Sequence, residues 1–442
     1  MFSRALLCVV VFFGMTSNAQ TQEQQAISLL DAYQLARQNA TDLAIARYRV
    51  DSAEAEKDVA LGQILPSVRL FGQWSKNKVD FDLGSMSRIE DYRGERYGVQ
   101  VAQPLIDVSA GQEVRRFNQI YRQSQEEFYV TESKLLAQVV EAFFNVLLAE
   151  TQLTQLQSEL SALEGQLEET AALHARKLVP VMEVLETQTR TDSVRADVIR
   201  ASGDLAISKE ALIKLTGARG AELQRVQDHI SLISAFSSPD EVAILAIQTN
   251  PEITAAQAAV EAAKLGVDRE RGRWIPRVEL TYSYQFSDVG FDNLASPPRD
   301  STTVAVGFNY PLFEGGSGAA RLKGAWAEYY AAKTQLEATR LDLEVRARSS
   351  WLNLKALTEH LGASKQAVKS SEVNVDAVTK ATKVGTAKPS EVLIALAQNT
   401  RANLEASAAK FQFAAGWLEV ELAAGNDPEA LAKQLSLAIH GW

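Results

Sequence analysis

Residues 276–287 read PRVELTYSYQFS, and residues 302–311 read TTVAVGFNYP. In both stretches apolar or aromatic residues alternate with polar ones, which is the period of a β-strand with one apolar and one polar face. Each stretch has about the 9–11 residues that a tilted membrane-spanning strand needs. An amphipathic hairpin on the core of a soluble domain would show the same alternation. The apolar positions are Val278, Leu280, Tyr282, Tyr284, Phe286, Val304, Val306, Phe308 and Tyr310.

Two earlier stretches, residues 66–76 and 95–104, show the same alternation. We therefore expect four strands per chain, with residues 287–301 as a polar, proline-containing loop. Four strands cannot close a barrel that holds a lumen, and an open strand edge in lipid leaves backbone groups unpaired. Strands that span a membrane must then pair with strands of other copies, and three copies would form a 12-stranded barrel. The apolar positions of the earlier stretches are Val68, Leu70, Trp74, Tyr97, Val99 and Val101.

Long proline-free stretches flank these strands. No proline occurs within residues 105–179, 181–238, 312–388 or 390–427. Inside these gaps apolar residues recur at alternating spacings of three and four, which is the pattern of coiled-coil packing. Because a proline inside a helix costs about 3 kcal/mol, such gaps permit long helices. A helix over all of residues 105–179 would be about 110 Å long, which exceeds what a compact domain holds.

The chain also repeats itself at a spacing of about 208 residues. Gly62–Leu70 resembles Gly272–Leu280, and Glu183–Leu185 is identical to Glu391–Leu393. Several separated matches at nearly one offset predict two structural repeats. We place the first repeat at residues 20–216 and the second at 241–425.

The N-terminus has the pattern of a secretory signal peptide over residues 1–19. Arg4 supplies the positive charge, Ala5–Phe13 is apolar, and Ser17–Ala19 offers small residues at the cleavage site. The apolar run is too short for a membrane-spanning helix. Cys8, the one cysteine, lies in this segment, so cysteine-based metal sites, disulfides and a thiol nucleophile are not expected in the mature chain.

Composition and motifs argue against an enzyme or a nucleic-acid-binding protein. The formal net charge is −10, which does not suit a surface that binds phosphates. The glycine-rich segment Glu314–Ala320 lacks the Lys-Ser/Thr of a phosphate-binding loop and the final glycine of a nucleophile elbow. We read it as a turn, and we expect no catalytic residue, metal or cofactor. The four histidines, His174, His229, His360 and His440, are too far apart in sequence for a local metal pair.

Three local motifs make the chain similar to the TolC family of outer-membrane efflux proteins. Glycine and proline mark the entry from helix to strand at Gly62–Pro66 and again at Gly272–Pro276. The strand exit at residues 310–316 reads YPLFEGG, and residues 383–393 read KVGTAKPSEVL, which resembles the family's helical tip. The first-repeat tip departs from the pattern, because Lys177 stands where the family has glycine.

The resemblance implies an α+β membrane protein that acts as a passive outer-membrane exit duct of a tripartite efflux or type I secretion system. In such a homotrimer, long antiparallel coiled-coil helices form a periplasmic tunnel and four strands per chain contribute to a 12-stranded transmembrane β-barrel. Residues 217–240 and 426–442 would form an equatorial layer. Its partners would be a periplasmic adaptor and an inner-membrane pump of the RND or ABC type. A periplasmic adaptor and a structural coiled-coil protein remain the alternatives at this point.

The resemblance also assigns roles to residues at the two helical tips, expected near residues 176–182 and 384–390. Glu391, with Ile394 on the following turn, would lie at a periplasmic gate. Outer-membrane lipid would contact the apolar strand face, chiefly at Val278, Leu280, Tyr282, Val304, Val306 and Phe308. The tip residues that would contact the adaptor are Arg176, Lys177, Leu178, Val179, Val384, Gly385 and Thr386.

Overall fold

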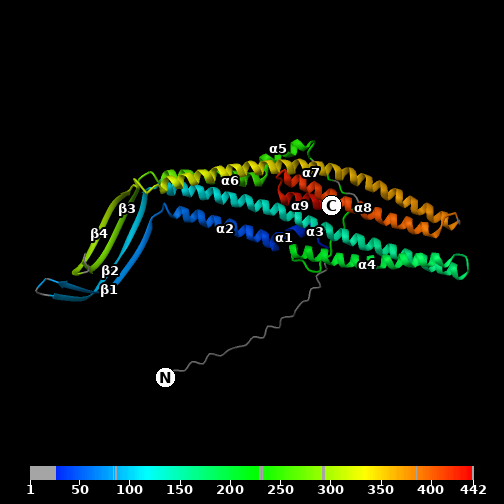
Figure 1. Ribbon diagram of the computed structural model, residues 1–442, viewed down its shortest axis with the longest axis horizontal. Coiled ribbons are helices and arrows are strands. Elements are labelled where there is room, and N and C mark those ends of the chain that lie inside the picture. Colours follow the sequence, from blue (N-terminus) through cyan, green and yellow to red (C-terminus); the bar gives the residue numbers. More distant parts are fainter. Residues whose placement is uncertain are drawn as a thin grey trace, which may run out of the picture.

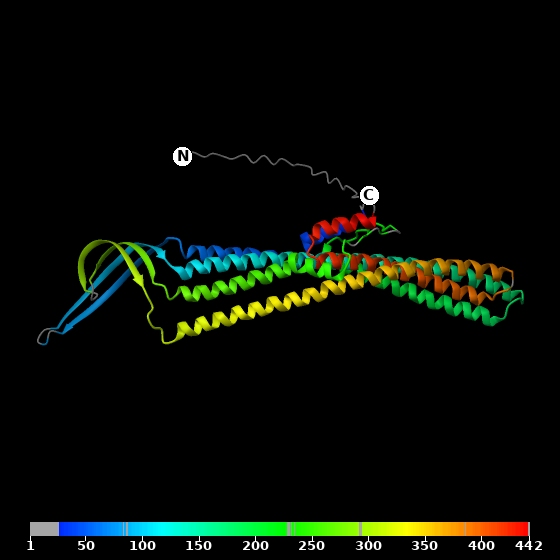
Figure 2. The same ribbon diagram turned by 90° about the horizontal axis from the view of Figure 1, so that it is seen from above.

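The computed structural model shows an elongated molecule with a β-sheet at one end and two helical tips at the other (Figure 1). It describes residues 26–82, 84, 87–227, 230, 232–233, 235–290, 294–384 and 386–440. The predicted signal peptide therefore lies outside the described residues. Figure 2 shows the same separation in the perpendicular view, with the C-terminal helix near the middle of the long axis.

The same order of elements, two helices, two strands and two helices, occurs twice along the chain. This order agrees with the sequence repeat. The first set is α1 (Leu29–Asn39), α2 (Thr41–Gly62), β1 (Ser67–Asp82), β2 (Ser87–Ile106), α3 (Val108–Ala175) and α4 (Val181–Thr216). The second is α5 (Pro239–Thr249), α6 (Pro251–Gly272), β3 (Arg277–Val289), β4 (Ala295–Asn309), α7 (Ser317–Lys383) and α8 (Pro389–Ala423), followed by α9 (Pro428–His440).

The four strands form one antiparallel sheet in the order β1-β2-β3-β4. The expectation of a mostly helical chain with four strands is confirmed. The outer edges of β1 and β4 pair with no other strand among the described residues.

The strand bounds differ from those predicted. β1 continues to Asp82, and β2 already begins at Ser87. The sequence did not predict these extensions, because the hairpin beyond residue 76 is rich in charged residues that hide the apolar alternation. β3 continues to Val289 and β4 begins at Ala295, so the predicted loop over 287–301 is wrong at both of its ends. Pro297 and Pro298 are tolerated there because β4 is an edge strand and its register shifts near its start.

α3 and α7 are the two long helices, with 68 and 67 residues, or about 100 Å each. The shorter helices meet end to end beside them. The Asn39 side chain, at the end of α1, donates a hydrogen bond to the Thr216 carbonyl at the end of α4 (2.8 Å). At the equivalent place of the second repeat, Thr249 Oγ1 donates to the Ala424 carbonyl (2.6 Å). These bonds satisfy carbonyls that a helix end leaves free.

A belt around the middle of the molecule contains α1, α9 and the segment that follows α4. The backbone N–H of Gln227 donates to the Ile439 carbonyl, which ties the segment to α9 (2.8 Å). Arg37 of α1 pairs with Glu132 of α3 (2.7 Å) and with Glu429 of α9 (2.6 Å). Burial raises the pKa of the Glu132 carboxyl, while the Arg37 charge acts in the opposite direction. The main apolar core lies under this belt, where Phe143 and Trp417 are fully buried.

Candidate functional site

The strand register gathers the predicted apolar positions on one face of the sheet. Directly paired residues of an antiparallel sheet share a face, and Val68 pairs with Val101, Val101 with Tyr282, and Tyr282 with Val304. In the neighbouring rows Leu70 pairs with Val99 and Leu280 with Val306. These rows also place the polar Thr302 and Gln103 on this face. Leu70 is 81% exposed and Phe308 is 79% exposed, so this face is largely apolar and open in the single chain. Tyr310 lies just past the end of β4 and outside this register.

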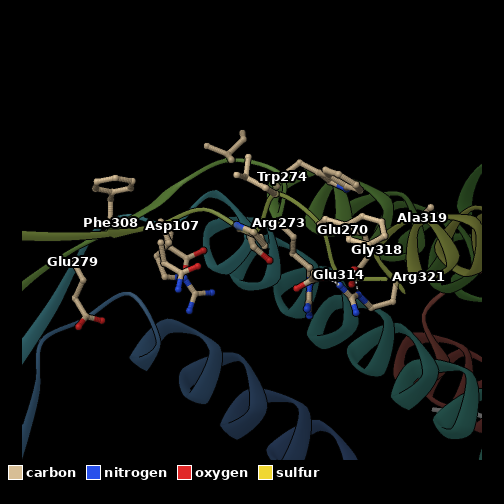
Figure 3. A pocket seen from close by; sticks show the side chains of 18 of the residues that line it. Asp107, Glu270, Arg273, Trp274, Glu279, Phe308, Glu314, Gly318, Ala319 and Arg321 are labelled. Atoms are coloured by element: carbon tan, nitrogen blue, oxygen red, sulfur yellow. Dashed lines mark hydrogen bonds and ion pairs between the residues drawn. The ribbon is translucent and has the colours of Figure 1, made fainter. Parts of the chain in front are cut away.

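The opposite face of the sheet is polar. Its rows include Arg69 paired with Gln100, Gln100 with Ser283, and Ser283 with Thr303. Figure 3 shows the division at the root of the sheet, where Phe308 points to one side and Glu279 to the other. The sheet thus has one largely apolar face and one polar face. The wall of an aqueous pore in lipid has the same composition, with the apolar face toward lipid and the polar face toward the lumen.

An ionic cluster around one buried carboxylate lies where the sheet joins the helices (Figure 3). Glu270, near the end of α6, is 4% exposed. Its carboxylate contacts Arg269 (2.7 Å), Arg273 (3.2 Å) and Arg321 of α7 (3.5 Å), and Arg321 also pairs with Glu314. The cluster links α6, the turn after β4 and α7.

The same junction contains an open cavity of about 700 Å³. Residues of β3, β4, α6 and α7 line it, together with Asp107 at the start of α3. Arg277 at the start of β3 pairs with Asp107, the N-cap of α3, at 2.8 Å, and so links the sheet to the start of α3. In the glycine-rich segment Glu314–Ala320, the residues up to Gly316 form the turn into α7, as expected from their glycines, and the rest begin α7 itself.

The first tip is a tight helix end with a strained residue. The Leu178 N–H donates to the Leu173 carbonyl and the Lys177 N–H to the His174 carbonyl, which is the Schellman pattern. Lys177 has φ 60°, a conformation that glycine normally supplies. The departure noted in the sequence therefore leaves the turn intact but places a lysine in its left-handed position.

The second tip has the equivalent hydrogen bond, from the Thr386 N–H to the Ala381 carbonyl (2.9 Å). Val384 is 75% exposed. Gly385 lies outside the described residues. The two tips lie at the same end of the molecule in both views, far from the sheet (Figures 1 and 2). The structure therefore brings together the tip residues that the sequence predicted to meet a partner.

Glu391 and Ile394 lie three residues apart on one exposed face of α8, close to the second tip. Ile394 is 58% exposed, whereas its neighbour Leu393 is buried against Leu163 of α3 and Val194 of α4. This small cluster joins the two helical hairpins. Because Leu393 faces the neighbouring hairpin, Glu391 and Ile394 are left on a different side of α8.

Sequence reasoning missed several surface residues at the tips. Val181 and Met182, in the first turn of α4, are 54% and 61% exposed. Both fall within the tip range expected from the sequence, but they were not among the residues predicted to contact the adaptor. Their position directly after Pro180, the N-cap of α4, is a signal that could have added them. Among the described residues, no cluster of histidine, cysteine or acidic side chains could hold a metal ion, and no helix is long and apolar enough to cross a membrane.

An exposed apolar sheet face at one end and two paired helical hairpins at the other define a channel-forming protein of the outer membrane with a long periplasmic tunnel. Residues 32–218 and 243–426 match the family model described as outer membrane efflux protein, and the chain belongs to this family. The resemblance to the TolC family is thereby confirmed. The chain is an outer-membrane exit duct for efflux or secretion, which replaces the adaptor and structural alternatives. The family forms channels rather than enzymes.

The chain is similar over most of its length to known proteins of this kind. It is 25% identical to the outer membrane protein TolC of Vibrio cholerae, covering 91% of each chain. It is 24% identical to the alkaline protease secretion protein AprF of Pseudomonas aeruginosa, covering 92% of this chain and 86% of AprF. The Campylobacter jejuni CmeC outer membrane channel has the same fold, with a TM-score of 0.79 at 16% identity, covering 93% of this chain and 89% of CmeC.

Proposed function

We propose that three copies of this chain form one continuous duct from the periplasm through the outer membrane. The observation that carries the proposal is the sheet, which has one largely apolar face and whose two outer edges pair with no other strand in the described part of the chain. Unpaired edges are costly in lipid, and pairing β1 of each copy with β4 of the next removes all of them in a closed ring of 12 strands. The purified protein reconstituted in planar bilayers should conduct ions as a trimer; a monomer without conductance would refute the proposal.

We further propose that the duct works with a periplasmic adaptor and an inner-membrane pump of the RND or ABC type. The two tips end farthest from the sheet, so they are the parts that a complex anchored in the inner membrane can reach (Figure 1).

Protein export through a type I secretion system is a second candidate beside efflux. It is favoured by the similarity to AprF and to the proteases secretion protein PrtF of Dickeya chrysanthemi, which is 24% identical and covers 93% of this chain.

The lipid-facing side of the sheet can be tested with a matched pair on β4. Val306 lies on the apolar face, and Thr303 lies on the polar face. A Val306→Lys substitution should cost about 2–4 kcal/mol near the membrane midplane and reduce the amount of assembled trimer, because it places a charge in lipid. Thr303→Lys should cost much less. Trimer yield on native gels after extraction checks this, and equal yields would show that the faces are assigned wrongly.

Tip docking can be tested by cross-linking in cells. Cysteines introduced at Lys177 and Thr386 should form disulfide or maleimide cross-links to the adaptor, because both residues lie on the tip turns. A cysteine at exposed Glu429 of the belt is the control and should give little adaptor product. Cross-links that form only at the belt would contradict docking at the tips.

Glu391 should make the periplasmic mouth prefer cations. Three copies would place three carboxylates around a narrow axis, and rings of carboxylates attract cations in channels. A Glu391→Gln variant should lose most of the block by divalent or trivalent cations added on the periplasmic side. Single-channel conductance in planar bilayers measures this loss.

Glu183, the repeat mate of Glu391, is the matched control. It is half-buried in the first turn of α4, so Glu183→Gln should leave cation block unchanged. Undiminished block in Glu391→Gln, or equal loss in both variants, would show that Glu391 does not set the cation preference.

A further inference from the structure

The two tips lack acidic residues in a chain that is acidic overall. The formal net charge is −10, yet no Asp or Glu occurs between Glu169 and Glu183 or between Asp376 and Glu391. These acid-free segments contain both tip turns. Within them lie His174 and five lysine or arginine residues, Arg176, Lys177, Lys380, Lys383 and Lys388. The end of the molecule farthest from the sheet is therefore locally basic.

Three of these basic side chains are exposed and have no carboxylate partner among the residues that the structure describes: Arg176, Lys177 and Lys388. Several basic side chains on the bodies of the hairpins do have such partners. Arg195 pairs with Glu164 (2.9 Å), and Lys209 pairs with Glu150 (2.9 Å). The tip charges are thus not neutralised within the chain and are available to a partner.

Exposed apolar side chains occupy the same turns as these charges. Leu178 is 67% exposed, Met182 is 61% exposed and Val384 is 75% exposed. A protein interface typically has an apolar centre that is desolvated on binding and a polar rim around it. Apolar side chains among unpaired basic ones give the tips this composition.

We propose that the tips bind a partner whose own tip carries acidic side chains around an apolar contact, namely an acidic helical hairpin of the periplasmic adaptor. This inference rests on the docking of an adaptor at the tips and adds the chemistry that selects it. Opposite charges around an apolar contact favour the right partner and repel a basic one. Lys177 contributes to this selection from the left-handed turn position, where the glycine of the family pattern would bring no charge.

The test uses the full-length channel in nanodiscs and two synthetic helical-hairpin peptides. The peptides differ only in the loop, where leucine is flanked by glutamates in one and by lysines in the other. The acidic hairpin should bind, and binding should weaken as salt is raised to about 0.5 M, because the charges are solvent-exposed. Reversing one charge at each tip, with Lys177→Glu and Lys388→Glu together, should weaken binding of the acidic hairpin roughly tenfold.

The matched control reverses two exposed lysines on the body of α7, with Lys365→Glu and Lys369→Glu. It changes the net charge equally and should leave binding unchanged. Equal binding of both hairpins, binding of neither, or preferential binding of the tips to phosphatidylglycerol vesicles would overturn the inference. Cysteine cross-links at the tips report docking separately. If they form while the acidic hairpin fails to bind, docking stands and the charge selection fails.

Discussion

Replacing Gly425 with alanine should destabilise the assembled protein by about 2–4 kcal/mol per chain. Gly425 ends α8 in the left-handed conformation, with φ 84°. A Cβ atom there would lie 2.9 Å from the backbone nitrogen and Cα of Asn250, where α6 begins. The substitution therefore combines an unfavourable backbone conformation with a clash against backbone that cannot rotate away. Thermal unfolding of the detergent-solubilised protein, followed by circular dichroism, measures the loss.

Two other glycines provide graded controls for this prediction. Gly217 ends α4 with φ 72°, but its Cβ would meet only the Asn39 side chain at 3.3 Å, so Gly217→Ala should cost about 1–2 kcal/mol. Gly203, inside α4, has no atom within 4 Å of its added Cβ, and Gly203→Ala should raise stability by about 0.5–1 kcal/mol. A different order of the three variants would show that the end-to-end helix contact does not control stability.

Replacing Glu270 with alanine should cost about 2–3 kcal/mol, because it removes a buried carboxylate that accepts charged hydrogen bonds and ion pairs from three partly exposed arginines. The Glu270 carboxylate is 4% exposed and lies within 3.5 Å of nitrogens of Arg269, Arg273 and Arg321. The loss should appear as a lower melting temperature and as a lower yield of the proposed trimer, since the cluster joins the helices to the sheet. Glu270→Gln, which keeps the volume, should lose less.

Asp268 is the matched control for the ionic cluster. It lies on the same helix and pairs with Arg271 at 3.3 Å, but both side chains are partly exposed. Asp268→Ala should therefore cost no more than about 1 kcal/mol. Equal losses in the Asp268 and Glu270 variants would contradict the claim that burial, rather than pairing, makes the cluster important.

The sequence predicted the class of elements well where periodicity was strong. The alternation in residues 276–287 marks β3, and the proline-free gaps contain α3 and α7. It failed at the ends of strands, because charged residues in the β1–β2 hairpin and two prolines in β4 do not show the apolar alternation. Those residues are held in strands by ladder hydrogen bonds to a neighbour, which no local pattern records.

At the helical tips, too, local sequence patterns predicted only part of the structure. The glycine pattern of the second tip predicted a turn, and the missing glycine at Lys177 left the first tip uncertain. The structure shows that Leu178 and Lys177 donate the same pair of turn hydrogen bonds that glycine-containing helix ends use. Val181 and Met182 lay within the predicted tip range, but which of its side chains are exposed depends on the tertiary packing of α3 and α4.

By itself the sequence determined the signal peptide pattern, the two repeats, the apolar strand positions and the lack of a catalytic motif, since all of these are local or periodic. Only the tertiary structure decided which residues share one face across four strands, which helix ends meet, and that Glu270 collects three arginines from two helices. These features depend on contacts between residues far apart in sequence, as with Thr249 and Ala424. Such contacts follow from register and packing, which a one-dimensional pattern does not contain.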